Sequence, residues 1–264
     1  MNTISVVVHG ALGRVGREVI NAVSREPGMK VVGAVEIKSK EESLPLPDDA
    51  GSVPLSSDLD KIISTCQPDV LVDFTVAPST MKAIPIVTQR KVNLVIGTTG
   101  LTENDLKEID RLATANGVGA FVAPNFALGA VIMMHLASIA AKYFDYAEVI
   151  ELHHHQKVDS PSGTALSTAR AMAKSRGKPF TYVTQKGDVE SRGKQVDGIA
   201  IHSIRLPGLM AHQEVILGTA GQTLSIRHDT INRECYMPGV LLAIKEVGKH
   251  KGLVYGLDTL LGLE

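Results

Sequence analysis

One short stretch of the 264-residue chain gathers side chains that could transfer protons and bind an anion. Residues 151–165 read E-L-H-H-H-Q-K-V-D-S-P-S-G-T-A, with three consecutive histidines followed closely by Lys157. An imidazole can donate or accept a proton near neutral pH, and a lysine ammonium is a fixed cation or a second proton donor. The stretch therefore offers acid–base groups beside a positive charge.

The histidines follow a predicted strand. The run Ala147–Leu152 is typical of a strand that leads into them. Side chains of an extended chain alternate between two faces, so His153 and His155 should point one way and His154 the other. Two histidines on one face could alternatively bind a metal ion. Since no cysteine–histidine or His-x-x-x-His set elsewhere supplies an obvious third ligand, acid–base work is favoured and no metal site is predicted.

A helix start follows the lysine. Pro161, which lies between two serines, is typical of the first turn of a helix that should run from Thr164 to about Lys174. The N–H groups of Ser162, Gly163 and Thr164 would then lack partners within the helix. They would form a binding site for an anion such as a carboxylate.

The elements at the N-terminus indicate nucleotide binding. Ile4–Val8 is almost entirely β-branched, which is typical of a strand buried on both faces. It runs into G-A-L-G-R-V-G at residues 10–16, and after a helical spacing the apolar run Met29–Val35 ends at Glu36. Strand, glycine turn, helix, strand and terminal acid are the arrangement of a dinucleotide-binding fold. Its glycines let the backbone approach a pyrophosphate, and its acid binds ribose hydroxyls.

Further strands alternate with helices in the first half of the chain. Short strands are predicted at Val70–Asp73, Asn93–Ile96 and Gly119–Val122, and Thr102 is expected to cap a helix between the last two. The polar, proline-bearing segment Lys38–Asp58 is expected to be a loop. The alternation predicts a Rossmann-like, doubly wound parallel sheet of the α/β class, which binds ligands at the carboxyl ends of its strands.

The pattern changes after Phe126. A long apolar helix over Leu128–Tyr143 precedes the histidine strand, and the polar segment Ser175–Gln195 is expected to be rich in loops. Three further strands are predicted, at Ile199–Arg205, His212–Leu217 and Leu224–His228. Since no helices separate them, consecutive strands should pair antiparallel, which predicts a second α+β domain built on an open mixed or antiparallel sheet. With few helices to cover it, this sheet is expected to pack against copies of itself.

The end of the chain returns to a helical pattern at Arg233 and closes with the apolar tail Leu253–Leu263. We expect this tail to rejoin the first domain, because a domain inserted in a loop leaves the termini of its parent together. The prediction is a dinucleotide-binding domain of residues 1–127 plus about 234–264. Residues 128–233 would form a substrate-binding and oligomerisation domain.

Composition excludes several classes of function. The formal net charge is −1, and no block of like charges is present, which argues against nucleic-acid or membrane-surface binding. No apolar run approaches the length of a membrane span. Two cysteines in no motif and an N-terminus that enters a strand at once, with no charged leader, predict a cytoplasmic protein.

These motifs together resemble one family over the whole chain, the 4-hydroxy-tetrahydrodipicolinate (dihydrodipicolinate) reductases. Residues 151–165 are similar to the family signature E-x-H-H-x-x-K-x-D-x-P-S-G-T-A, and G-A-L-G-R-V-G, V-D-F-T, G-T-T-G and A-P-N-F stand in the expected order. Arg205 to Gly208 with His212, and Arg233 with Gly239, also resemble family patterns. The resemblance implies NADH- or NADPH-dependent reduction of a cyclic imine dicarboxylate to tetrahydrodipicolinate, in lysine and diaminopimelate biosynthesis, by a homotetramer.

The resemblance also implies roles for residues. His153 would be the catalytic proton donor or acceptor and Lys157 the second proton donor, while His155 falls at a variable position. The substrate would be held by His154, Lys157, Gly163 and Thr164. The nicotinamide cofactor would be bound by Gly10, Ala11, Leu12, Gly13, Arg14, Val15, Glu36, Gly97, Thr98, Thr99, Ala123, Pro124, Asn125 and Phe126.

One position departs from the family. Many members carry an arginine directly after the ribose-binding acid, where it meets the 2′-phosphate of NADPH, but this chain has Ile37 with Lys38 and Lys40 close behind. The charge of Glu36 opposes a phosphate there, and an isoleucine cannot offset it. We expect NADH to be used at least as well as NADPH.

Two other functions are compatible with parts of the sequence. A related NAD(P)-dependent oxidoreductase acting on a different amino or imino acid would keep the glycine turn but should lose the paired histidines and P-S-G-T-A together. A non-catalytic NAD(H)-sensing module would have no need of Lys157 beside an anion-binding helix start. The sequence therefore favours the reductase.

Overall fold

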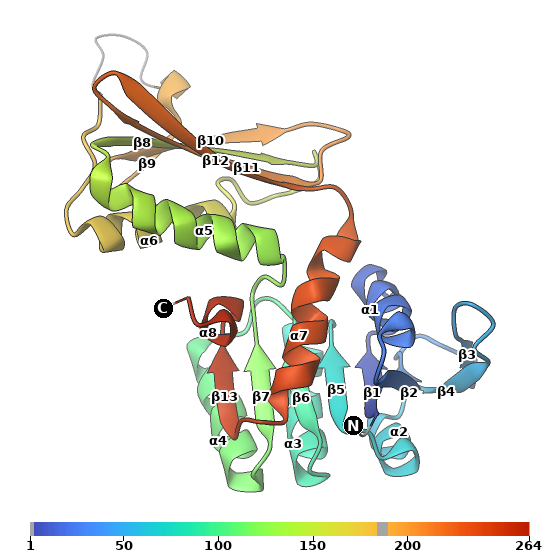
Figure 1. Ribbon diagram of the computed structural model, residues 1–264. Coiled ribbons are helices and arrows are strands. Elements are labelled where there is room, and N and C mark those ends of the chain that lie inside the picture. Colours follow the sequence, from blue (N-terminus) through green and yellow to red (C-terminus); the bar gives the residue numbers. More distant parts are fainter. Residues whose placement is uncertain (1–2, 184–189, 264) are drawn as a thin grey trace. The chain divides into compact units, whose positions relative to one another are not determined.

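The computed structural model describes residues 3–183 and 190–263. The chain divides into two compact units, one of Met1–Ala127 with Arg233–Glu264 and the other of Leu128–Asn232. Both are drawn in Figure 1. Residues 184–189, within the predicted loop Ser175–Gln195, lie outside the described residues.

The first unit is built on an eight-stranded sheet. In order across the sheet, the strands are β13 (Gly252–Tyr255), β7 (Gly119–Val122), β6 (Asn93–Ile96), β5 (Val70–Asp73), β1 (Ile4–His9), β2 (Met29–Val35), β4 (Ser52–Ser56) and β3 (Ser43–Pro45). All neighbours pair parallel except β3, which is antiparallel to β4 at the edge. The predicted doubly wound parallel sheet is confirmed.

Helices lie on both faces of this sheet (Figure 1). Side chains of α2 (Leu59–Cys66), α3 (Ala77–Gln89) and α4 (Glu103–Asn116) pack with the strands in one apolar core. The opposite face carries α1 (Arg14–Arg25) and α7 (Met237–Val247). The short helix η3 (Arg233–Tyr236) directly precedes α7, and α8 (Leu257–Leu261) follows β13. Because β1 is covered on both faces, its three central valines have no exposed surface.

Two predictions about this unit are confirmed by its hydrogen bonds. Thr102 caps α4 in a reciprocal arrangement with Asp105, in which each side chain bonds the other residue's N–H. The C-terminal tail supplies β13, which pairs with β7, so the tail does rejoin the first unit.

The prediction that Lys38–Asp58 is a loop is wrong, because the segment holds β3 and β4. Val53 and Leu55 of β4 are buried, while the residues between and beside them are not. This alternation involves only two apolar residues, and the prolines and acidic residues around it make the strand hard to recognise in the sequence. Strand β4 is also stabilised by pairing with β2, which lies outside the segment.

The second unit is built on a five-stranded mixed sheet. Its strands, in order across the sheet, are β12 (Gln222–Thr230), β11 (Ala211–Thr219), β8 (Tyr146–His153), β10 (Ile199–Arg205) and β9 (Lys194–Val196). Its helices are α5 (Leu128–Ala140), which continues into η1 (Ala141–Tyr143), α6 (Gly163–Arg176) and η2 (Glu190–Arg192). Side chains of α5, η1 and α6 share one apolar core with alternate residues of β8, β10 and β11.

The prediction that consecutive strands pair antiparallel holds for β11 and β12 but is wrong for β10 and β11, which are not neighbours in the sheet. Strand β8 lies between β10 and β11, parallel to the first and antiparallel to the second. The connection between β10 and β11 therefore passes over the end of β8, where Arg205 and Ala211 both stand in register with His153. The central position in the sheet is thus taken by β8, which is distant in sequence from β10 and β11. The end of β8 at His153 therefore has a neighbouring strand on each side.

Within the described parts of the chain, no helix is both long enough and apolar enough to cross a membrane.

Candidate active site

The predicted alternation of the three histidines is wrong after the first. Strand β8 ends at His153, and a turn follows in which the N–H of Lys157 donates to the carbonyl of His154 at 3.1 Å. His153 and His154 are partly buried, whereas His155 is exposed. Because the chain leaves the strand after His153, the three histidine side chains lie in different environments. Across the described residues, no group of three or more His, Cys, Asp or Glu side chains could hold a metal ion.

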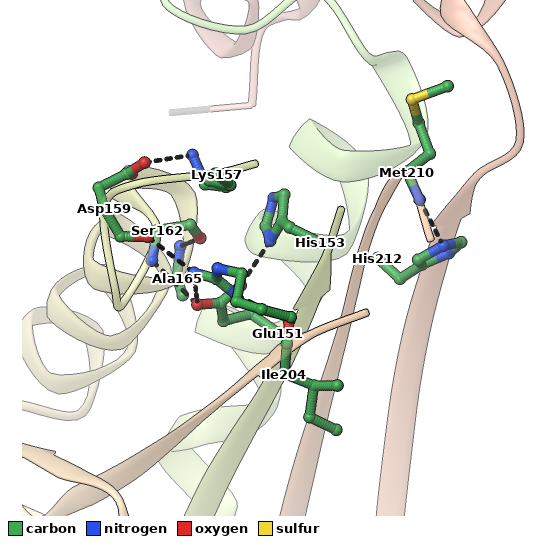
Figure 2. A network of polar contacts seen from close by, with 10 residues as sticks. Glu151, His153, Lys157, Asp159, Ser162, Ala165, Ile204, Met210 and His212 are labelled. Carbon is green, nitrogen blue, oxygen red and sulfur yellow. Dashed lines mark hydrogen bonds and ion pairs between the residues drawn. The ribbon is translucent and has the colours of Figure 1, made fainter. Parts of the chain in front are cut away.

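Behind His153 lies a buried carboxylate. Glu151 is 0% exposed, and its oxygens accept hydrogen bonds from Nδ1 of His153 at 2.5 Å and from the main-chain N–H of Ser162 at 3.2 Å. Arg205 of β10 donates to both oxygens, at 2.9 and 2.7 Å. Figure 2 shows this network at the end of β8. Burial raises the pKa of Glu151, but the hydrogen bonds from His153, Arg205 and Ser203 outweigh it and lower the pKa to about 2.

The buried carboxylate determines which nitrogen of His153 can act. An ionised carboxylate only accepts hydrogen bonds, so Nδ1 of His153 carries a hydrogen that is directed to Glu151. Nε2 is then the ring nitrogen that can exchange a proton with a ligand. A carboxylate that orients a histidine in this way is a common device for fixing its tautomer.

The start of α6 is partly used by the protein itself. Ser162 is the N-cap, and its hydroxyl accepts from the N–H of Ala165 at 3.2 Å. Its own N–H is bound to Glu151, so Ser162 does not offer the predicted anion donor. The binding site for an anion narrows to the N–H groups of Gly163 and Thr164, hereafter the anion seat. A Cβ at Gly163 would have no atom within 4 Å, so the space beside it is open.

Arg205 links Glu151 to the loop that follows β8. Besides Glu151, its guanidinium donates to the main-chain carbonyl of Asp159 at 2.7 Å. The Asp159 carboxylate forms an ion pair with Lys157, with Nζ and Oδ1 2.7 Å apart. His153 and Lys157 are thus connected through Glu151, Arg205 and Asp159. Figure 2 shows His153 beside Glu151 and Lys157 beside Asp159.

His212, which the sequence analysis associated with the family pattern but gave no role, orders the loop after β10. Its Nδ1 is 2.7 Å from Oδ1 of Asp229. Its Nε2 accepts the N–H of Met210 at 3.3 Å (Figure 2). Both ring nitrogens are therefore engaged by the protein. The contacts hold the connection that passes over the end of β8.

In the first unit, the glycine turn is shaped for close approach. Gly10 has a φ of +82°, and a Cβ there would lie 2.9 Å from the carbonyl oxygen of Phe74. A Cβ at Gly16 would lie 2.1 Å from the carbonyl oxygen of Gly10, so α1 can start this near the turn only with glycine. No side chain caps α1 at Gly13. These features fit a pyrophosphate bound at the start of the helix.

Glu36 lies at the same turn. Its carboxylate accepts the N–H of Leu12 at 3.3 Å, which brings the end of β2 to the glycine turn as a ribose-binding acid requires. The next side chain, Ile37, is 66% exposed and takes no part in the core.

The remaining predicted cofactor residues differ in how exposed they are. Thr98 is buried, and its hydroxyl donates to Asp73 at 3.1 Å, so its side chain faces the protein. Three others are buried, namely Ala11, Ala123 and Phe126. Arg14, Thr99 and Pro124 are exposed.

Asp73, to which the sequence motifs assign no role, organises this end of the sheet. Its buried carboxylate lies 3.1 Å from Nδ1 of His9 and accepts from the N–H of Thr75 at 2.9 Å and from Thr98. Burial raises the pKa of Asp73, but the hydrogen bonds from His9 and Thr75 outweigh it and lower the pKa. The strand ends of β1, β5 and β6 are joined where the strand order reverses, the place at which such sheets bind ligands.

Comparison with known proteins supplies the family. The family model described as dihydrodipicolinate reductase, N-terminus, matches residues 4–126, and the model for the C-terminus matches residues 129–261. This chain belongs to the dihydrodipicolinate reductase family. It reduces 4-hydroxy-tetrahydrodipicolinate to tetrahydrodipicolinate with NADH or NADPH, a step of lysine and diaminopimelate biosynthesis.

Full-length relatives agree. The 4-hydroxy-tetrahydrodipicolinate reductase of Dehalococcoides mccartyi is 56% identical over 263 residues and covers 100% of both chains. That of Moorella thermoacetica is 49% identical and covers 98% of both. A dihydrodipicolinate reductase from Paenisporosarcina sp. TG-14, solved with dipicolinate bound, is 40% identical with a TM-score of 0.86, covering 98% of this chain and 99% of that one.

More distant structures share the fold alone. An amine dehydrogenase from Mycobacterium smegmatis is 14% identical with a TM-score of 0.67, over 97% of this chain and 96% of its own. Membership in the reductase family favours catalysis on the dicarboxylate over both alternatives, the related amino- or imino-acid oxidoreductase and the sensing module.

Proposed function

We propose that His153 and Lys157 are the proton donors of the reduction and that a carboxylate of the substrate binds at the anion seat. The observation that carries this proposal is the pairing of His153 with the buried Glu151 carboxylate. The net reaction adds a hydride and a proton to the substrate and releases water. When bound, the nicotinamide supplies the hydride.

The second unit would supply the proton donors of the reaction. Hydride addition to a cyclic imine leaves electrons on the ring nitrogen, and a proton donor near that atom lowers the barrier. Nε2 of His153 is suited to this task because Glu151 holds the other nitrogen. The ammonium of Lys157 supplies a second donor or a counter-charge on the same network.

The substrate's negative charge requires fixed donors. The N–H groups of Gly163 and Thr164 open α6, where the helix dipole favours an anion. Lys157 and His154 lie in the loop that leads to them and would offset the charge of the carboxylates. This assigns the substrate-binding role to the residues that the signature names.

Cofactor binding is assigned to the first unit. The turn from Gly10 to Gly13 with Arg14 and Val15, and Glu36 beside it, would hold the pyrophosphate and the ribose. The other candidates lie at the ends of β6 and β7 and are Gly97, Thr98, Thr99, Ala123, Pro124, Asn125 and Phe126. Since Ile37 is exposed and uncharged, we infer that NADH is used at least as well as NADPH.

Alanine variants test the catalytic assignment. His153→Ala and Lys157→Ala should each lower kcat by roughly 100-fold or more, because general acid catalysis is worth about 10²–10⁴-fold. His154→Ala should act mainly through KM, and the exposed His155 is the control in which alanine changes little. The substrate is generated in the assay from pyruvate and aspartate semialdehyde by the preceding synthase, and loss of nicotinamide absorbance is followed.

The outcome separates catalytic from structural roles. Unchanged thermal midpoints with turnover lost only for His153 and Lys157 would support the assignment. Full activity of Lys157→Ala would end it.

We also propose a homotetramer that acts in the cytoplasm. In the second unit, strand register places Ile150, Leu152, Ile204 and Ile216 on the face of the sheet opposite the residues that pack with α5 and α6. The same face also carries Glu148, His202 and Glu214, and a mixed apolar and polar face of this kind supports packing against another copy of the sheet. Light scattering that finds a stable monomer at micromolar concentration would contradict the tetramer.

A further inference from the structure

Lys157, the cation proposed to bind the substrate, already has an anionic partner in the protein. The ammonium of Lys157 is 2.7 Å from Oδ1 of Asp159, whose side chain is 56% exposed. The ion pair with Lys157, aided by the N–H groups of Asp159 itself and of Gly163, holds the pKa of Asp159 below its usual range. Asp159 thus satisfies the same two groups, a lysine ammonium and the Gly163 N–H, that a substrate carboxylate would use.

The backbone of Asp159 is held independently of its side chain. Arg205 donates to the Asp159 carbonyl at 2.7 Å and is itself held by the two oxygens of buried Glu151. Rotation of the exposed Asp159 side chain away from Lys157 therefore needs no movement of the loop. It also disturbs no apolar core, since the side chain faces solvent.

We propose that Asp159 is a specificity-determining residue, an internal carboxylate that occupies Lys157 and the Gly163 N–H of the anion seat until a carboxylate of the ligand displaces it. This inference rests on the proposed function, because it takes the anion seat as the place of a ligand carboxylate. Every anion must then compete with a tethered carboxylate that is always present. A ligand with a second carboxylate or other contacts can do so, whereas a small monoanion gains too little.

Competition of this kind has a measurable size. An exposed ion pair between a lysine and an acid is worth up to about 1 kcal/mol, so removing the internal competitor should tighten ligand binding by about two- to fivefold. Asp159→Asn keeps the size of the side chain and removes its charge. The probe is dipicolinate, titrated by calorimetry into the enzyme with saturating NADH.

Two further variants complete the design. Asp48→Asn is the matched control, since it removes the same charge from an exposed ion pair with Arg25 in the first unit and should leave dipicolinate affinity unchanged. Lys157→Met should weaken dipicolinate binding, and adding Asp159→Asn to it should bring no gain, because the cation for which the two carboxylates compete is gone.

The outcomes distinguish this inference from the proposed function. Tighter binding to Asp159→Asn, lost in the Lys157→Met background, is the expected result. Unchanged or weaker binding to Asp159→Asn, with Lys157→Met still impaired, overturns the competition and leaves the anion seat standing. Equal binding to wild type and Lys157→Met overturns both.

Discussion

Replacing Glu151 by glutamine tests the centre of the site. The carboxylate is 0% exposed and accepts hydrogen bonds from His153, from Ser162 and, twice, from Arg205. Glutamine has nearly the same shape, but it carries no charge and presents one acceptor oxygen and an NH₂ group. The variant leaves the guanidinium of Arg205 without its counter-charge and Nδ1 of His153 without an anionic acceptor.

The expected loss of stability follows from the pKa of Glu151. A fall from 4.5 to about 2 on folding corresponds to about 3 kcal/mol of stability. Because the folded pKa is the lower one, this contribution is present above pH 4.5 and is lost as the pH falls through about 2. The difference in unfolding free energy between wild type and Glu151→Gln should therefore be about 3 kcal/mol at pH 7, narrow below pH 4.5 and close near pH 2.

The catalytic effect is separate from the effect on stability. Without the carboxylate, His153 is no longer held in the tautomer that leaves Nε2 to act, so kcat should fall by about 10²–10⁴-fold at a temperature where the variant is folded. Affinity for NADH, assigned to the other unit, should stay near that of wild type. In His153→Ala, adding Glu151→Gln should cost little further activity, because the two residues act together.

Glu148 supplies a matched control on the same strand. It pairs with Arg192 and His202, its side chain is 35% exposed, and its replacement by glutamine should cost little stability and no activity. Wild-type turnover in Glu151→Gln would refute the positioning role. A loss of stability that does not change between pH 7 and pH 2 would refute the electrostatic account.

Four further predictions concern separate parts of the molecule. Ile37→Arg should shift the ratio of kcat/KM values toward NADPH; a wild type that already prefers NADPH by a hundredfold would contradict the reasoning. Gly163→Ala places a methyl group in open space, so the thermal midpoint should hold while KM for the substrate rises; an unchanged KM would argue against the anion seat. Gly16→Ala brings a Cβ to 2.1 Å from the Gly10 carbonyl oxygen, so calorimetry should show weakened NADH binding, and wild-type affinity would contradict the fit. Ile216→Glu should dissociate the proposed tetramer, which light scattering would show as a lower mass. An unchanged mass would contradict the proposal that this face of the sheet is an interface.

Local patterns were sufficient for much of the fold. The β-branched run of β1, the glycine turn and the apolar spacing of α1 predicted a parallel dinucleotide-binding sheet, because burial on both faces and a helix start at glycine leave strong local signals. The cap of α4 at Thr102 was predicted for the same reason, since its hydrogen bonds are made within three residues. The family signature at residues 151–165 identified the family, which the matches over both halves of the chain confirm. The roles of the individual site residues stay predictions.

The tertiary structure decided what depends on partners distant in the chain. Strand β8 takes the place between β10 and β11 because pairing reflects the whole sheet, not the order of the strands. Glu151 stood in the signature without a role, since nothing nearby in sequence shows that Arg205, 54 residues later, neutralises it from the next strand. The same arginine anchors Asp159, and Glu151 takes the N–H of Ser162 that the sequence had assigned to an anion. Residue types and spacing predicted that proton donors and an anion site lie together, whereas only folding determined which of their hydrogen bonds the protein itself already satisfies.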